Sequence, residues 1–198
     1  MENVFDGVSA DAAGQRMRHA RNPGPWGRIE YAYSRMARNA GIDMPDTYLL
    51  RDGRFAHFMT RRFDRVRDDT KGTFGRLHFH SLGGLQHIDF NDRYVFSYEG
   101  YFDTIRAIGL GQRSVNEAHR RMVFSVATVN FDDHVKNFGL LMDPAGQWRL
   151  APAYDVTYAE SDAWTRQHQM SVRGKFREIT RGDLLEVGEM FDVPGGRA

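Results

Sequence analysis

The chain has 198 residues, 41% of them hydrophobic, which fits one domain with a packed core rather than a disordered chain. Its formal net charge of +1 gives no overall attraction to nucleic acid or to a membrane. It has no cysteine, which excludes disulfides and thiolate metal sites. No apolar run approaches the roughly 20 residues that span a bilayer, and the N-terminus lacks a signal-peptide pattern. The sequence predicts a soluble, cytoplasmic protein.

Residues 1–25 are polar, rich in Gly and Ala, and end at Asn22-Pro23-Gly24-Pro25, a strong chain breaker. This composition predicts a linker or a flexible tail, followed by one folded unit over residues 26–198. From Trp26, apolar side chains recur at steps of three and four as far as Ala40, which predicts a helix that ends at Gly41.

Two apolar runs, 47–50 and 55–59, flank Asp52-Gly53 and predict a β-hairpin, because Asp-Gly tolerates the positive φ of a tight turn. The charged run 64–71 is interpreted as a solvated loop. In residues 76–90, Gly83-Gly84 interrupts a mixed His/Leu segment and favours a short, broken helix.

Helix signals dominate the rest of the chain. Ser97 is placed to cap a helix through Ile108, and Ser114 with Glu117 forms a capping box that opens a helix through about Val129. The segments 138–142 and 147–150 predict a second β-hairpin around residues 143–146. Thr180 and Asp183 mark the start of one more helix, which we expect to end near Phe191.

The most informative stretch lies between the predicted second helix of this region and the second hairpin. It reads Asn130-Phe131-Asp132-Asp133-His134-Val135-Lys136-Asn137, and Ala151-Pro152-Ala153-Tyr154-Asp155-Val156 follows the hairpin. Phosphoryl transfer from ATP needs one carboxylate to orient the attacking hydroxyl, and an amide and a second carboxylate to hold Mg²⁺. Protein kinases meet this need with an Asp, an Asn five residues later, and an Asp beyond a hairpin. Asp132, Asn137 and Asp155 have this spacing.

The five-residue step selects Asp132 rather than Asp133, which lies only four residues before Asn137 and is expected to point elsewhere. Lys136 is placed to approach the γ-phosphate, and His134 to brace the loop by hydrogen bonding. The competing interpretation is that an Asp- and Asn-rich segment is simply a turn. A metal site formed by His78, His80 and His87 is disfavoured, since their spacing fits no regular ligand set.

These residues resemble a known family. The segments 132–138 and 150–156 look like the C-terminal kinase core of HipA toxins. Glu30-Tyr31 at the start of a helix, Gly41-Ile42-Asp43-Met44-Pro45 and Arg62-Phe63-Asp64-Arg65 resemble further motifs of the same family, in the same order. The resemblance covers the chain from about Trp26 to about Leu185.

The resemblance implies an α+β, protein-kinase-like (HipA-type) C-terminal helical lobe with a remnant of the N-lobe β-sheet. It implies Mg·ATP-dependent phosphorylation of a protein serine or threonine, with Asp132 as the catalytic residue and Asn137 and Asp155 as magnesium ligands. Arg61, Arg62 and Phe63 would form the hinge, where backbone groups meet the adenine. Family members often carry Glu at the position of Arg61, and a backbone contact survives that change.

The resemblance also implies partners: a HipB-like DNA-binding antitoxin and a protein substrate, for which aminoacyl-tRNA synthetases are the family's targets. Family members carry a phosphate-binding Lys on a strand before the Glu-containing helix, whereas residues 1–25 contain no Lys. This departure predicts either a separate N-lobe subunit or a core that is incomplete at both ends. Two functions therefore stay open: an active HipA-type kinase, and an inactive module that binds nucleotide or a partner without turnover. A third, weaker possibility is a structural fragment without a ligand.

Overall fold

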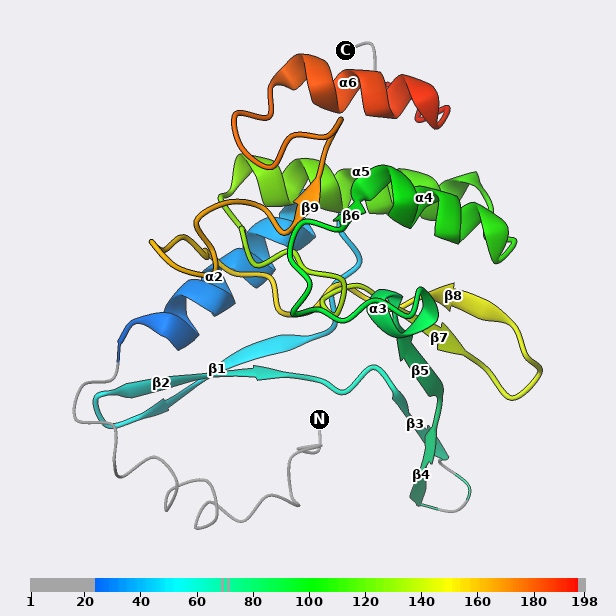
Figure 1. The fold of residues 1–198 in the computed structure, drawn as a ribbon. Coiled ribbons are helices and arrows are strands. Elements are labelled where there is room, and N and C mark those ends of the chain that lie inside the picture. The colour runs from blue at the N-terminus through cyan, green and yellow to red at the C-terminus, as the bar shows by residue number, and fades with distance from the viewer. Residues whose placement is uncertain (1–23, 69, 71, 196–198) are drawn as a thin grey trace.

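The N-terminal part of the fold is a helix packed on a two-stranded sheet (Figure 1). A computed structural model describes residues 24–68, 70 and 72–195, so most of the predicted tail at 1–25 lies outside the described residues. Helix α2 (Trp26–Asn39) packs on the antiparallel hairpin of β1 (Thr47–Asp52) and β2 (Phe55–Thr60). The predicted helix and first hairpin are confirmed.

The charged run at residues 64–71 is not simply a loop, as the sequence pattern had predicted. Arg65–Asp68 forms strand β3, which pairs antiparallel with β4 (Thr73–Arg76). Val66 and Phe74, which belong to these strands, are about half exposed. A hairpin that buries little apolar surface has no alternating pattern in its sequence, and for this reason it was missed.

The segment 76–90 combines a strand with a single helical turn. Strand β5 (His78–Ser81) leads directly into α3 (Leu82–Leu85), and the Ser81 hydroxyl caps this turn by accepting a hydrogen bond from the Gly84 N–H. The predicted broken helix is therefore right only for the four residues of α3. Residues 78–81 are extended because they pair with a later strand.

That strand is β7 (Gly139–Met142), which lies between β5 and β8 (Trp148–Leu150) in a three-stranded antiparallel sheet. His78 pairs with Met142 and Ser81 with Gly139. The β7–β8 turn is held by the Asp143 carboxylate, which accepts hydrogen bonds from two backbone N–H groups. The second predicted hairpin is confirmed.

Three longer helices form the other half of the molecule: α4 (Tyr98–Ala107), α5 (Gln112–Ala127) and α6 (Arg181–Met190). Ser97 caps α4 through the Gly100 N–H, and Thr180 and Asp183 form a capping box at α6, both as predicted. The predicted capping box at Ser114 is wrong. Helix α5 begins earlier, at an extended Gly111, and its Glu117 carboxylate instead accepts hydrogen bonds from arginines of the same helix.

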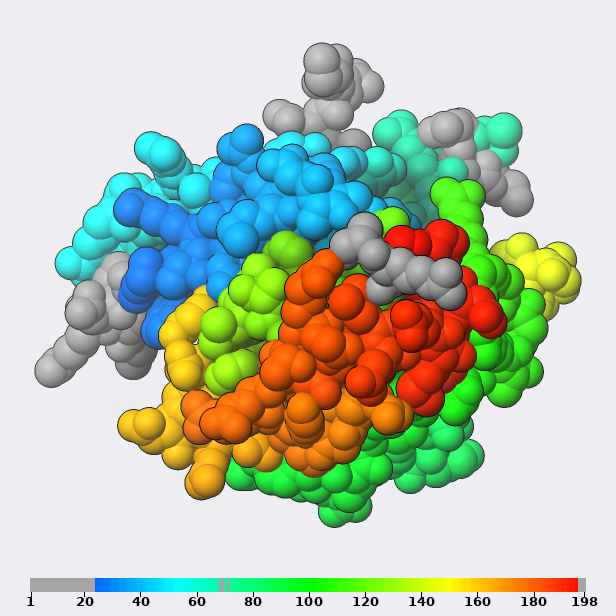
Figure 2. Space-filling model, turned by 90° about the horizontal axis from the view of Figure 1, so that it is seen from above, coloured from blue at the N-terminus to red at the C-terminus, as the bar shows by residue number. Residues whose placement is uncertain are grey.

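The main core lies between α4, α5, α6 and the three-stranded sheet, and its largest fully buried side chains include Tyr98, Tyr101 and Phe102. Strand β6 (Phe96–Ser97) pairs in parallel with β9 (Met170–Ser171), which ties the late part of the chain to the start of α4. Figure 2 shows this late part, coloured orange and red, covering the green helices from above. No helix of the described residues is long and apolar enough to cross a membrane.

A second, smaller core joins the two halves. It consists of buried Ala37 and Ile42 from the α2 region, Phe124 from α5 and Ala153 from the segment after β8. The Ala153 N–H also donates a 2.7 Å hydrogen bond to the Asp43 carbonyl oxygen. This cluster fixes α2 next to residues 153–156, and so determines which side chains face the candidate site.

We predict that Gly27→Ala separates α2 from β2. The new Cβ would lie 2.2 Å from the Ala56 carbonyl oxygen, and overpacking of this kind costs about 1–3 kcal/mol. The matched control is Gly182→Ala in the first turn of α6, where the nearest atom would lie at an ordinary 3.5 Å. We expect the control to be neutral or slightly stabilising. Urea unfolding of both variants tests this, and equal stability of the two would contradict it.

Candidate functional site

The loop between α5 and β7 closes on itself at the two predicted positions Asp132 and Asn137. The Asn137 side-chain amide donates a 2.8 Å hydrogen bond to the Asp132 carbonyl oxygen, and its backbone N–H donates one to the His134 carbonyl oxygen at 2.9 Å. Val129, at the start of the loop, has a φ of 58°, which turns the chain sharply away from α5. These contacts bring together two residues that are five positions apart.

Asp155 reaches the same place from the segment that follows β8. The Tyr154 hydroxyl donates a 2.6 Å hydrogen bond to the Lys136 carbonyl oxygen, which ties this segment to the loop. Asp155 is exposed and has a φ of 55°, in the left-handed region that non-glycine residues seldom occupy. Such a conformation persists only where its surroundings enforce it, and it is often found at functional sites.

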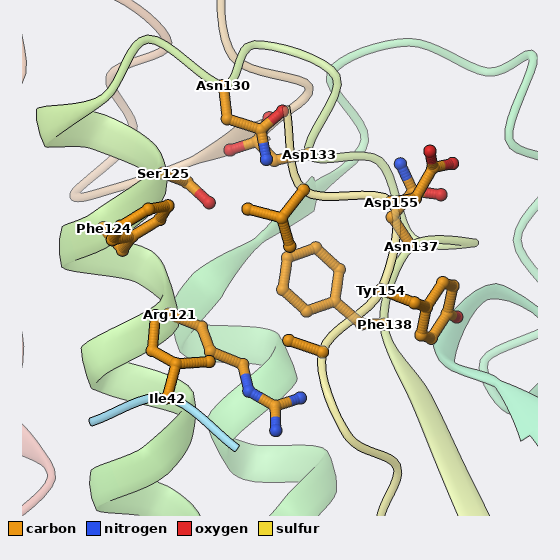
Figure 3. A pocket seen from close by; sticks show the side chains of 12 residues that line it. Ile42, Arg121, Phe124, Ser125, Asn130, Asp133, Asn137, Phe138, Tyr154 and Asp155 are labelled. Atoms are coloured by element: carbon orange, nitrogen blue, oxygen red, sulfur yellow. The ribbon is translucent and has the colours of Figure 1, made fainter. Parts of the chain in front are cut away.

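A small pocket lies where these elements meet (Figure 3). Its lining includes Asn137 and Asp155 on one side and Arg121, Phe124 and Ser125 of α5 on the other. Asp132 lies outside it. The pocket holds about 20 Å³, which is space for about one water molecule, so a nucleotide would have to lie across its mouth rather than inside.

The two predicted metal ligands fit a magnesium ion in their chemistry. The hydrogen bond to Asp132 uses the amide nitrogen of Asn137, which leaves the amide oxygen as the group that could meet a cation beside the Asp155 carboxylate. Among the described residues no three His, Asp or Glu side chains gather as a metal cage. Mg²⁺ is commonly held by one or two protein oxygens together with phosphates and waters, so a two-residue site suits it.

Several acidic groups lie close together in this region, and their surroundings disfavour the ionised form of two of them, Glu30 and Asp132. Burial, together with the Asp155 carboxylate, raises the pKa of Glu30 on α2. The pKa of Asp132 is also raised, chiefly by burial and further by Asp155 and Asp133, while His134 and a hydrogen bond from Trp164 oppose the shift. A cation bound among these groups would relieve their repulsion.

Asp133 has the opposite environment to its neighbour Asp132. It is 1% exposed, and its carboxylate accepts hydrogen bonds from the Tyr98 hydroxyl, His168 Nδ1 and the Gln169 N–H at 2.7–2.8 Å. The Asp133 carboxylate is thus bonded to internal donors, although Asp133 also belongs to the lining of the pocket, whereas Asp132 does not. A carboxylate whose lone pairs are used internally is a poor candidate for a base, which leaves Asp132, whose side chain is 35% exposed.

The predicted hinge residues lie near the site but differ in their surroundings. Phe63 packs on Tyr154 and Phe79, with ring centroids 5.5 and 5.9 Å away. The Arg61 side chain lies 3.7 Å from the Asp46 carboxylate, and the Arg61 N–H donates to the Asp46 carbonyl oxygen. Phe63 is thus part of an aromatic cluster beside Asp155, whereas the Arg61 N–H is already used.

Phe90, in the loop after α3, lies on the outer side of the loop that contains Asp132 and Asn137. The Lys136 ammonium lies 3.2 Å from the centre of the Phe90 ring, and the His134 ring packs on it at 5.8 Å. His134 Nε2 is 3.7 Å from an Asp132 carboxylate oxygen. The structure therefore places His134 against Asp132, while Lys136 rests on Phe90 and does not line the pocket.

Comparison with known protein families identifies this arrangement. The model of the HipA-like C-terminal domain matches residues 10–193. The chain belongs to this family. The resemblance noted in the sequence is therefore confirmed.

Two solved structures resemble the chain. HipA of Shewanella oneidensis MR-1, solved with HipB and its operator DNA, matches with a TM-score of 0.73 and 18% identity over 85% of this chain and 44% of that one. The proinflammatory kinase CtkA of Helicobacter pylori matches with a TM-score of 0.49 and 16% identity, over 67% of this chain and 47% of that one. The likeness to HipA confirms the predicted α+β, kinase-like fold. The chain spans less than half of each of these proteins.

Some residues of the HipA-like site carry no signal in the sequence. Trp164 and Phe90 lie in irregular segments, and their ring centroids are 6.3 Å apart beside the loop that contains Asp132 and Asn137. The role of Asp133 was also missed, because its partners lie 35 or 36 positions away in the chain. His78, one of the three histidines for which a metal site was disfavoured, packs on the Trp148 ring with centroids 5.8 Å apart.

The raised pKa of Asp132 predicts that Asp132→Asn is more stable than the unaltered chain at pH 7. The pKa of Asp132 is higher in the folded chain than in the unfolded chain, where it is near 3.8. The contribution of Asp132 to the free energy of unfolding therefore falls as pH rises through the folded pKa. Asn carries no charge, so the difference in melting temperature should shrink as pH falls toward 3.8. Thermal melts across this pH range measure it.

Asp183→Asn is the control with the opposite sign. Hydrogen bonds from Lys175 and Thr180 lower the pKa of Asp183, so its contribution is present at pH 7 and is lost only in acid. We expect this variant to melt below the unaltered chain at pH 7. If both variants moved in the same direction, the assigned environment of Asp132 would be wrong.

Proposed function

We propose that this chain carries the Mg·ATP site and the catalytic loop of a serine/threonine protein kinase of the HipA toxin type. The observation that carries the proposal is the closed loop in which Asn137 holds Asp132, with Asp155 on the same pocket as Asn137. Membership of the HipA-like family and the kinase-like fold support it. A turn without function would not be expected to place Asn137 and Asp155 on one pocket with Asp132 beside it.

Adenine binding is assigned to the aromatic cluster of Phe63, Phe79 and Tyr154. These rings lie 5.5–5.9 Å from one another, next to Asp155, and offer an apolar, aromatic surface for a base. Among the described residues, no backbone carbonyl accepts a hydrogen bond from the Phe63 N–H, so this group can donate to a ring nitrogen. The Arg61 N–H is occupied, and this leaves the Arg61 carbonyl as the second hinge group.

In this mechanism the chain orients the reactants and moves one proton. Magnesium, when bound by Asn137 and Asp155, supplies positive charge to the phosphates. Asp132 accepts the proton of a serine or threonine hydroxyl of the substrate. The hydroxyl oxygen bonds to the γ-phosphorus as the bond between this phosphorus and the ADP oxygen breaks. A raised pKa makes Asp132 a stronger base at neutral pH than an ordinary aspartate.

Among the described residues, we assign Lys136 as the cation that contacts the γ-phosphate. It is adjacent to Asn137, and its ammonium is held only by the face of the Phe90 ring. Such contacts are worth about 0.5–1 kcal/mol at exposed sites, so a phosphate can draw the ammonium away. Lys175, by contrast, is committed to both oxygens of Asp183.

The alternative, a module that binds without turnover, is favoured by Glu30. Its carboxyl is half-buried near Asp155, and neither Lys136 nor Lys175 contacts it. Protein kinases pair such a helix glutamate with a lysine that binds the phosphates. We propose that a partner, such as a separate N-lobe subunit, brings such a lysine to Glu30.

Two further partners follow from the family. The HipA relative was solved with HipB and operator DNA, which supports a HipB-like DNA-binding antitoxin as a partner of this chain. The net charge of +1 favours contact with DNA through such a partner rather than directly. A protein substrate of the type expected for the family is an aminoacyl-tRNA synthetase.

The first test concerns the nucleotide site. We expect calorimetry to detect weak binding of ATP that requires Mg²⁺, and Asp155→Asn to weaken it on the order of tenfold or more through loss of a charged ligand. The control is Asp103→Asn, an exposed carboxylate on α4 away from the pocket. Binding that is unaffected by removal of magnesium or of Asp155 would exclude the proposed site.

The second test separates kinase from binding module. We expect Asp132→Asn to retain Mg·ATP affinity but to lose transfer of the labelled γ-phosphate to protein by about 10²–10⁴-fold, the usual contribution of a catalytic base. Asp103→Asn should transfer at the unaltered rate. If the unaltered chain binds Mg·ATP but transfers nothing, even with its copurifying partners, the binding-module alternative is correct.

A further inference from the structure

A buried negative charge lies directly beside the proposed catalytic base. The Asp133 side chain is fully inaccessible, and burial of a carboxylate is costly unless hydrogen bonds compensate it. Three donors do so: the Tyr98 hydroxyl at 2.8 Å, His168 Nδ1 at 2.7 Å and the Gln169 N–H at 2.7 Å. The proposed mechanism gives this group no task.

The donors come from two separate parts of the chain. Tyr98 is the first residue of α4 and belongs to the main core, in which it is fully buried. His168 and Gln169 belong to the segment between Asp155 and α6, directly before β9. The Asp133 carboxylate therefore joins this segment to the rigid helical core, and it does so at the position next to Asp132.

Other contacts attach the same segment to the catalytic loop. The Phe131 N–H donates to the Ala159 carbonyl oxygen, and the Ala159 N–H to the Val129 carbonyl oxygen. The Gln169 side chain donates to the Trp164 carbonyl oxygen at 3.0 Å. The segment 157–170 is thus held at Ala159 and again at His168–Gln169, and Trp164 lies between the two attachments.

We propose that Asp133 is a positioning residue, whose buried carboxylate locks the segment 157–170 against the catalytic loop and so sets the place of Asp132. In protein kinases the corresponding order is often created by phosphorylation, through new pairs between arginine and phosphate. Here the Asp133 carboxylate holds the segment directly, through His168 and the Gln169 N–H. The segment therefore takes its ordered form without modification of its own hydroxyl groups.

The catalytic consequence of this proposal rests on the proposed kinase function, whereas the anchoring does not. The hydroxyls of Ser161 and Thr165 bond to each other at 2.9 Å in an exposed turn. They make no contact with Asp133. Removal of either hydroxyl should therefore leave the anchor intact, which provides a matched control.

The experiment uses the whole chain with Asp133→Asn, Asp133→Ala, His168→Ala and the control Thr165→Ala. Amide hydrogen exchange of residues 157–170 is compared with that of α4 and α5, and transfer rate is measured beside Mg·ATP affinity. Asp133→Asn keeps one acceptor oxygen, and His168→Ala leaves the carboxylate with two donors. These milder changes keep the test valid if Asp133→Ala does not fold.

We expect faster exchange confined to residues 157–170 in Asp133→Asn and His168→Ala, with Mg·ATP affinity unchanged. The transfer rate should fall on the order of tenfold to a hundredfold, because small displacements of a reacting group have effects of this size. Thr165→Ala should behave as the unaltered chain in every measurement.

Uniformly faster exchange that includes α4 and α5 would show a purely structural role and overturn the proposal. Unchanged exchange in residues 157–170 would overturn it as well. If the unaltered chain shows no transfer at all, the proposed function fails, while local exchange in the two milder variants still decides whether Asp133 anchors the segment.

Discussion

The hydrogen bond from the Asn137 amide to the Asp132 carbonyl oxygen is the contact on which the rest of the site depends. It spans 2.8 Å and closes a loop that has no regular secondary structure of its own. The Asn137 N–H, which donates to the His134 carbonyl oxygen at 2.9 Å, closes the same loop. The buried strand β7 then fixes the loop from one side, and the Tyr154 hydroxyl fixes it from the other through the Lys136 carbonyl.

Electrostatics explain why such a site costs stability in the absence of a ligand. Glu30, Asp132 and Asp155 come from three separate parts of the chain, and Asp155 raises the pKa of each of the other two. The small core formed by Ala37, Phe124 and Ala153 forces this proximity by fixing α2 beside residues 153–156. The packing energy of this small core therefore offsets a charge repulsion that a bound cation would remove. Such a cost in stability is expected at a functional site.

The sequence predicted those parts of the fold that have a strong local code. The Asp-Gly turn, the Ser97 cap and the Thr180–Asp183 box each specify their element within a few residues, and each was found as predicted. Strands β3 and β5 were missed because each is extended only through pairing with another strand, β4 and β7, and the local pattern does not reveal these partners. The sequence around Ser114 fits a capping box, but α5 begins before it, with Gly111 as the N-cap residue.

The same distinction holds within the candidate site. The spacing of Asp132, Asn137 and Asp155 was visible because it is set along the chain, and the structure brings Asn137 and Asp155 to one pocket beside Asp132. Asp133 was set aside as a base on spacing alone, and nothing in the sequence indicated its three distant donors. Two consecutive aspartates thus differ in solvation: Asp132 keeps a partly exposed carboxylate with a raised pKa, and Asp133 is fully buried and bonded to three internal donors. Asp133 can set the position of Asp132 because its own carboxylate is held by internal donors. The two residues are identical in the sequence, and only the folded chain distinguishes them.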